Sequence, residues 1–147
     1  MTHVNFYQVP GDYQNALALA CELTVSAASS HHDVLLHVPD HRVGAQLDQL
    51  LANHPRAAFT TYSVAAQPRH AISISWGDTP RQHHGLLINL CPTATADWFS
   101  RFDKLIEIVY DDHSVTEHKR ARYRYYRDRG YPLGFQEQSL PLTAATA

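Results

Sequence analysis

Short apolar runs rich in strand-forming residues alternate along this chain with segments whose apolar residues recur every three or four positions. Strands are predicted over residues 3–9, 33–38, 59–64, 71–76, 85–90 and 105–110, and we expect the last of these to be the final strand. Helices are predicted after Asp12, after Pro39-Asp40, over 94–102, and within 114–130. Strands that alternate with helices predict a three-layer α/β sandwich of Rossmann-like topology, with a mostly parallel sheet and helices on both faces.

The length and composition of the chain limit the class of protein. At 147 residues it suits a single domain, which we expect over 1–137, followed by a flexible C-terminal tail over 138–147. We find no apolar run near the roughly 20 residues of a membrane-spanning helix, and no secretory signal at the N-terminus. Cys21 and Cys91 lie in separate segments, which favours free thiols in a reducing compartment. These features predict a cytoplasmic protein.

Motifs that bind cofactors or carry catalysis are absent from the sequence. The turn at 10–12, Pro-Gly-Asp, lacks the glycines and the lysine of a phosphate-binding loop, and there is no G-x-S-x-G elbow. The eleven histidines, His37 and His41 among them, form no set with metal-ligand spacing and are interpreted as solvent-exposed loop residues. Asp111 and Asp112 have the chemistry to hold Mg²⁺, but carboxylates before a helix also stabilise its dipole, which is the preferred interpretation. We therefore predict a protein without catalysis, cofactor or bound metal, and a nucleotide-dependent enzyme has no supporting motif.

Positive charge is concentrated in one segment of the chain, 118–131, which reads HKRARYRYYRDRGY. This segment holds six of the 12 Lys and Arg residues and four of the eight Tyr residues. Its formal charge is +5, whereas the whole chain is at −2, so the other residues together carry −7. A protein with this balance does not coat nucleic acid with its whole surface, and any electrostatic function must be local.

The basic segment has the signals of a helix of about four turns. Ser114 and Glu117 match an S-x-x-E capping box, and Gly130 stands where a helix-terminating glycine belongs. At about 100° per residue, one arc of the helix gathers Thr116, Arg120, Tyr123, Arg124 and Arg127, with Val115 and Tyr126 to one side of it. Ala121 and Tyr125 lie on the far side and are expected to face the sheet.

Three functions suit such a helix. Arginine stems can simply cover apolar surface on a solvated face. Arginines can also neutralise phosphates while tyrosines stack on bases, which predicts direct binding of single-stranded nucleic acid. Finally, the guanidinium fork suits an acidic peptide or a C-terminal carboxylate, with an aromatic ring as the wall of an apolar pocket. The acidic remainder of the chain favours the peptide over the nucleic acid, because it repels a phosphate backbone around the basic segment.

The pattern R-Y-(R/K)-x-Y-R-x-x-G-(F/Y) closes the predicted domain at 122–131 and resembles the chi subunit family of bacterial DNA polymerase III holoenzyme. Further motifs follow the order of that family: V-N-F-Y at 4–7, D-V-L-L at 33–36, L-D-Q-L-L at 47–51, Pro55 with Phe59, I-S-W at 74–76 and L-L-I-N-L at 86–90. Each motif is weak alone, but their order covers nearly the whole chain. The resemblance implies a non-catalytic accessory subunit of the clamp-loader complex, with polymerase activity only by association.

The same resemblance implies partners and a site. Chi proteins bind the acidic, Phe-ending C-terminal tail of single-stranded DNA-binding protein (SSB), and so reach single-stranded DNA indirectly. Carried over by position, the tail site comprises Val109, Arg120, Tyr123 and Arg124, with Arg127 and Gly130 nearby. The family also binds a small partner, psi, which bridges chi to the clamp loader. Phe59 belongs to that surface, but the neighbouring residues, Leu51-Ala52 and 60–62, depart from the usual psi-binding pattern.

Overall fold

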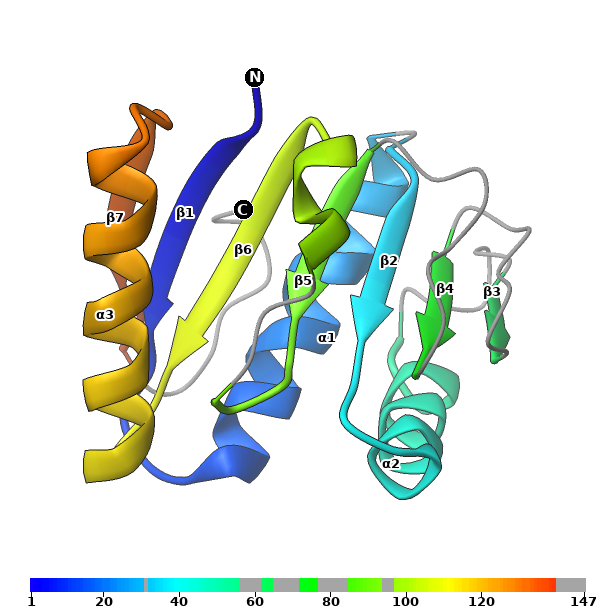
Figure 1. Ribbon diagram of the computed structural model, residues 1–147. Coiled ribbons are helices and arrows are strands. Elements are labelled where there is room, and N and C mark those ends of the chain that lie inside the picture. The colour runs from blue at the N-terminus through cyan, green and yellow to red at the C-terminus, as the bar shows by residue number, and fades with distance from the viewer. Residues whose placement is uncertain (31, 56–61, 65–71, 77–84, 94–96, 140–147) are drawn as a thin grey trace.

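The computed structural model describes the chain except residues 31, 56–61, 65–71, 77–84, 94–96 and 140–147. The described residues form a seven-stranded sheet with the order β3-β4-β2-β5-β6-β1-β7, and every strand pairing in it is parallel (Figure 1). The strands are β1 (His3–Gln8), β2 (Val34–His37), β3 (Tyr62–Val64), β4 (Ile72–Ser75), β5 (Leu86–Asn89), β6 (Lys104–Val109) and β7 (Leu133–Glu137). The helices are α1 (Tyr13–Ser29), α2 (His41–Ala52), the 3₁₀ helix η2 (Asp97–Arg101) and α3 (His113–Asp128).

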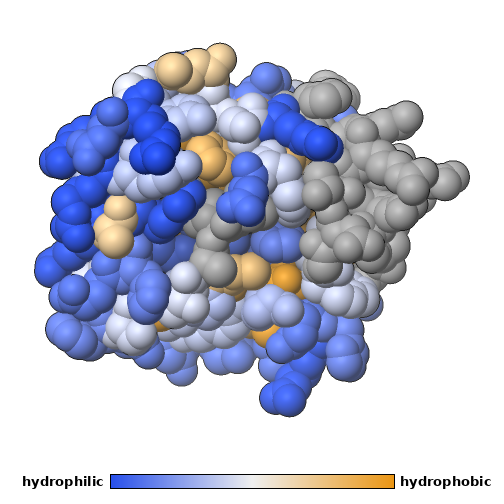
Figure 2. All heavy atoms as spheres, in the orientation of Figure 1, coloured by the Kyte–Doolittle hydropathy of each residue, from blue (hydrophilic) through white to orange (hydrophobic). Residues whose placement is uncertain are grey.

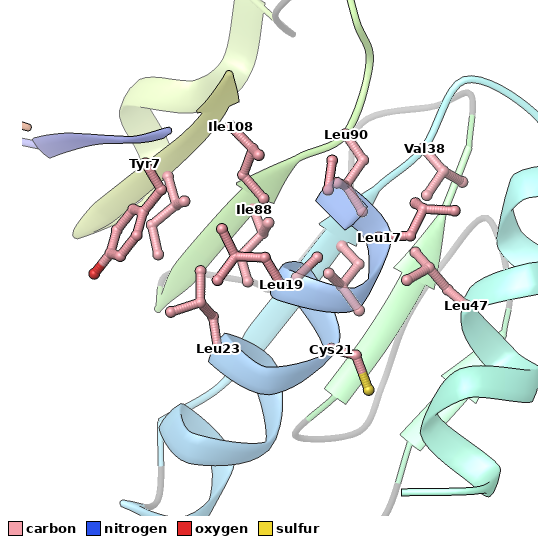
Figure 3. Packing of buried hydrophobic residues seen from close by; sticks show 14 of the residues in the cluster. Tyr7, Leu17, Leu19, Cys21, Leu23, Val38, Leu47, Ile88, Leu90 and Ile108 are labelled. Carbon is pink, nitrogen blue, oxygen red and sulfur yellow. The ribbon is translucent and has the colours of Figure 1, made fainter. Parts of the chain in front are cut away.

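Helices cover both faces of the sheet, which confirms the predicted α/β sandwich. One core lies under α1 and α2, where Leu17, Leu19 and Leu23 pack among sheet residues such as Ile88 and Ile108 (Figure 3). The other core lies under α3 and η2 and gathers Val4, Phe6, Leu35, Leu87, Phe99, Phe102, Leu105, Val109 and Tyr126. Successive side chains of a strand point to opposite faces, so β1 sends Phe6 into one core and Tyr7 into the other.

The helix starts follow the local signals in the sequence. Asp12 caps α1 by accepting a hydrogen bond from the backbone N–H of Gln14, and Asp40 caps α2 in the same way from Val43. The helix predicted over 94–102 is, in its described part, the 3₁₀ turn η2. None of the described helices is both long and apolar enough to cross a membrane.

The expectation that 105–110 forms the final strand is wrong, because β7 follows α3 and pairs with β1 from Val4↔Leu133 to Gln8↔Glu137. Local signals for β7 are weak, since it is short and contains Gly134. A Cβ at that glycine would meet the side-chain oxygen of Asn5 on β1, so the Asn5 side chain would have to move aside. The backbone N–H of Gln138 still donates to the carbonyl of Gln8, so the described chain stays beside β1 after β7 ends.

Candidate functional site

Helix α3 begins at an aspartate rather than at the predicted capping box. The Oδ1 of Asp112 accepts a hydrogen bond from the N–H of Val115 at 3.0 Å, whereas Ser114 already lies inside the helix. The neighbouring Asp111 accepts from the N–H of Gly11 at 2.8 Å. Asp112, two residues before Ser114, is therefore the cap and stands at the helix start as the sequence favoured, whereas Asp111 binds the turn after β1.

Gly130 ends α3, as the sequence predicted. Its φ is +80°, and its N–H donates to the carbonyl of Arg127 while the N–H of Tyr131 reaches back to the carbonyl of Tyr126. This pair of bonds is the Schellman arrangement, which requires a left-handed residue at the position of Gly130. The turn redirects the chain into β7, which returns along β1 beside the helix.

The face of α3 that meets the sheet differs from the predicted one. Val115, Lys119 and Tyr126 are buried, whereas Ala121 is exposed and Tyr125 is only half-buried. The prediction placed only apolar and aromatic residues toward the core and passed over Lys119. A lysine and a tyrosine can be buried when their polar ends find partners, and here both reach the same carboxylate.

That carboxylate belongs to Glu107 of β6, which is completely buried. Its Oε1 accepts from the Nζ of Lys119 at 2.9 Å and from the Nδ2 of Asn89 at 2.8 Å. Its Oε2 accepts from the hydroxyl of Tyr126 at 2.8 Å, and the Nη2 of Arg122 donates to that hydroxyl at 3.1 Å. A buried charge held by this many donors ties α3 to the sheet in one rotational setting.

The outward side of α3 forms a pocket with the edge of the sheet. The pocket has a volume of about 310 Å³ and is lined by Phe6, Gln8, Val109, Thr116, Lys119, Arg120, Tyr123 and Phe135. Three of the predicted site residues, Val109, Arg120 and Tyr123, therefore meet in one cavity. Figure 2 shows that the visible surface over α3 is mostly hydrophilic, and the sequence of α3 makes this surface basic.

Aromatic rings form the walls of this pocket. The ring of Tyr123 lies 5.4 Å from that of Phe6, centroid to centroid, and Tyr123 is 37% exposed. Phe135 of β7 is the register partner of Phe6 and is 53% exposed. Val109, at the end of β6, is nearly buried. The pocket thus combines apolar walls with the guanidinium of Arg120.

The other predicted site residues lie outside the lining of the pocket. Arg124 is exposed one turn beyond Arg120, and neither arginine makes an ion pair with any residue that the structure describes. Arg127 pairs with exposed Asp128 at 3.2 Å. Gly130 has the turn-forming role given above. Phe59 lies outside the described residues.

Sequence reasoning missed the two phenylalanines of the pocket, Phe6 and Phe135. Phe6 was noted only as part of a family motif, and Phe135 was placed just before the tail because β7 was not predicted. An available signal was the apolar alternation of Leu133 and Phe135 after the turn at Gly130, which is typical of a half-buried strand.

Histidine and cysteine side chains offer little reactive chemistry. His32 and His41 are exposed as expected, but His37 is half-buried with Trp98 at its edge, and burial lowers the pKa of its imidazole. Burial raises the pKa of the free thiols of Cys21 and Cys91 to about 11. Among the described residues, no three His, Cys, Asp or Glu side chains come together as a possible metal site.

Fold and site together define a class of protein: an α/β domain whose last helix carries an arginine-rimmed, aromatic-walled surface pocket. A comparison with protein families assigns the chain further. The family model described as "DNA polymerase III chi subunit, HolC" matches residues 1–134, so the chain belongs to the chi family, as the sequence motifs indicated.

Three proteins named DNA polymerase III subunit chi are similar to this chain. The Pseudomonas aeruginosa protein is 33% identical over 143 residues, which is 96% of this chain and 99% of that protein. The Escherichia coli protein is 28% identical over 119 residues, covering 78% of this chain and 80% of that protein. The Haemophilus influenzae protein is 29% identical over 119 residues, covering 78% and 82%.

Proposed function

We propose that this chi-family protein binds the acidic, Phe-ending C-terminal tail of SSB in the pocket beside α3. The observation that carries the proposal is the meeting of Arg120, Tyr123 and Val109 with the rings of Phe6 and Phe135 in one cavity. An apolar pocket beside a guanidinium suits a ligand that carries both an apolar ring and an anionic group, and a peptide that ends in an aromatic residue with a free carboxylate is such a ligand.

The geometry suggests how each part of the tail is held. A volume of about 310 Å³ suits one aromatic side chain, which would lie between Tyr123 and Phe135 over Val109. The terminal carboxylate would accept hydrogen bonds from the guanidinium of Arg120. Acidic residues upstream of it would meet Arg124, whose charge is not paired within the described residues.

We further propose that the protein links SSB to the clamp loader of DNA polymerase III as a non-catalytic, cytoplasmic accessory subunit. The relatives support this role because they are named as subunits of that polymerase. A psi-like protein is the proposed bridge to the clamp loader. Contact with single-stranded DNA would then be indirect, through SSB.

Isothermal titration calorimetry with a short Asp-rich peptide ending in Pro-Phe tests the tail site. We expect a Kd in the micromolar range that weakens with salt, because the contact is small and partly ionic. Removing the terminal Phe, or the change Arg120→Ala, should weaken binding at least about tenfold. Arg42→Ala, an exposed arginine on α2, is the matched control and should bind as the wild type does.

Two results would contradict the tail site. One is the absence of measurable heat at low salt with the intact peptide. The other is unchanged affinity after Arg120→Ala, since Arg120 supplies the guanidinium that lines the pocket.

A further inference from the structure

A second cationic and aromatic cluster lies on α3, away from the pocket. The guanidinium carbon of Arg122 lies 4.2 Å from the centroid of the Tyr125 ring, and that of Arg129 lies 3.7 Å from the same centroid. Arg122 stands almost one helical turn before Tyr125, and Arg129 about one turn after it. These three residues form what we term the arginine–tyrosine stack.

The stack is on a different side of α3 from the pocket. At about 100° per residue, Arg122, Tyr125 and Arg129 point roughly 140–200° away from Arg120 around the helix axis. Tyr125 packs against the core under η2, with its ring 5.6 Å from that of Tyr126. The sequence interpretation sent Tyr125 into the core, so the half-buried ring and its two arginines were not seen as a surface.

Within the described ranges, no carboxylate pairs with the two arginines of the stack, Arg122 and Arg129. The Nη2 of Arg122 donates to the hydroxyl of Tyr126, and its Nε is buried without a hydrogen-bond partner. The nearby Asp128 carboxylate accepts from Arg127 instead.

Stacked guanidinium groups are suited to single-stranded nucleic acid. A guanidinium beside a ring can stack on a base and bind a phosphate through its N–H edge. Arg129 is exposed and can do both, whereas the guanidinium of Arg122 also lies 4.8 Å from the Tyr126 ring and 5.9 Å from the Phe99 ring and is left mainly with its charge. An acidic peptide would use the charge alone and leave these planes empty. The two uncompensated arginines supply the charge complementarity that a phosphate chain requires.

We propose that the arginine–tyrosine stack binds a short stretch of single-stranded nucleic acid, with bases on the stacked planes and phosphates on Arg122 and Arg129. Two phosphate contacts give a shallow salt dependence, with a slope of log K against log salt of about −1.4. The acidic remainder of the chain repels further phosphates, so we expect no more than these two phosphate contacts. This site is independent of the proposed tail site, because the two share no residue.

Fluorescence anisotropy of a labelled oligothymidine with the full chain at low salt tests the stack. We expect weak binding, lowered about tenfold by Arg129→Ala and by Tyr125→Ala, because each change removes a stacking partner. Arg129 is exposed, so its replacement leaves the fold intact. Arg42→Ala and Arg120→Ala should keep the wild-type affinity for the oligonucleotide. A ribo-oligonucleotide of the same length distinguishes RNA from DNA as the source of the strand.

Three outcomes would overturn the proposal. The first is no binding of either oligonucleotide at low salt. The second is wild-type affinity in Arg129→Ala, and the third is a loss in Arg120→Ala as large as that in Arg129→Ala. Arg120→Ala should lower the affinity for the peptide but leave the affinity for the oligonucleotide unchanged. Failure of the tail site can therefore be told apart from failure of the stack.

Discussion

The Nζ of Lys119 lies 2.9 Å from the Oε1 of Glu107, and their side chains are only 4% and 0% exposed. This buried pair joins the middle of α3 to β6. Arg120 follows Lys119 directly in the helix, so the rotational setting that buries Lys119 also directs Arg120 toward the pocket. Burial of an ion pair has a large desolvation cost, and here Asn89 and Tyr126 satisfy the remaining lone pairs of the carboxylate.

Replacement of Lys119 should destabilise the fold. We expect Lys119→Met to lower the free energy of unfolding by about 3–5 kcal/mol, because the Glu107 carboxylate stays buried without its cation. Urea unfolding followed by circular dichroism measures the change. The double variant Glu107→Gln, Lys119→Met should be more stable than Lys119→Met alone, since it removes the uncompensated charge. Equal stability of Lys119→Met and the wild type would contradict the buried pair.

Phe135→Ser should lower the affinity for the peptide without lowering the stability of the fold. The ring is 53% exposed, so its loss should change the free energy of unfolding by less than about 1 kcal/mol. Calorimetry should show affinity for the Phe-ending peptide reduced about tenfold, since one wall of the pocket is gone. A peptide without the terminal Phe serves as the control, and its weak binding should be the same with both proteins. Unchanged affinity for the full peptide would exclude β7 from the site.

His37 should make the protein less stable in mild acid. Burial lowers the pKa of its imidazole in the folded state, so the unfolded state binds a proton more readily. The stabilisation is complete above the unfolded pKa of about 6.5 and is lost as the pH falls through the folded value. Urea titrations at about pH 7.5 and pH 5.5 should show a smaller loss for His37→Phe than for the wild type. The control is an exposed residue that does not titrate, Gln46, and Gln46→Ala should keep the wild-type loss.

Gly130→Ala should destabilise the end of α3. The φ of Gly130 is +80°, and a Cβ added there meets no atom within 4 Å, so the effect is conformational rather than steric crowding. We expect a loss of about 1 kcal/mol in the free energy of unfolding, measured by urea titration. Gly130→Asn should lose less, because asparagine adopts the left-handed region more readily. If the alanine variant matches the wild type, the turn into β7 does not depend on this glycine.

Much of the fold was predictable from short segments, because their signals are local. Asp12 and Asp40 stand directly before amphipathic segments, and both cap the helices that follow. Gly130 likewise ends α3 through hydrogen bonds within its own turn. By contrast, β7 escaped prediction because its hydrogen bonds come from β1, more than a hundred residues earlier in the chain.

The candidate site was predictable in part for the same reason. Helical spacing alone brought Arg120, Tyr123 and Arg124 to one arc. The assignment of Ala121 and Tyr125 to the sheet side was wrong for Ala121 and only partly right for Tyr125, because a buried carboxylate selects the inner face of the helix. Glu107 attracts Lys119 and Tyr126 inward, and that leaves Tyr125 at the surface between two arginines.

The sequence by itself determined the concentration of positive charge in one helix, the starts of α1 and α2, the end of α3 and the α/β alternation, since each depends on neighbours a few positions apart. Only the tertiary structure decided which side of α3 faces solvent and where the pocket opens. It also decided that Phe135 lines that pocket. Those features depend on contacts between distant segments: the ion pair from Glu107 to Lys119, and the parallel register that sets Phe135 beside Phe6.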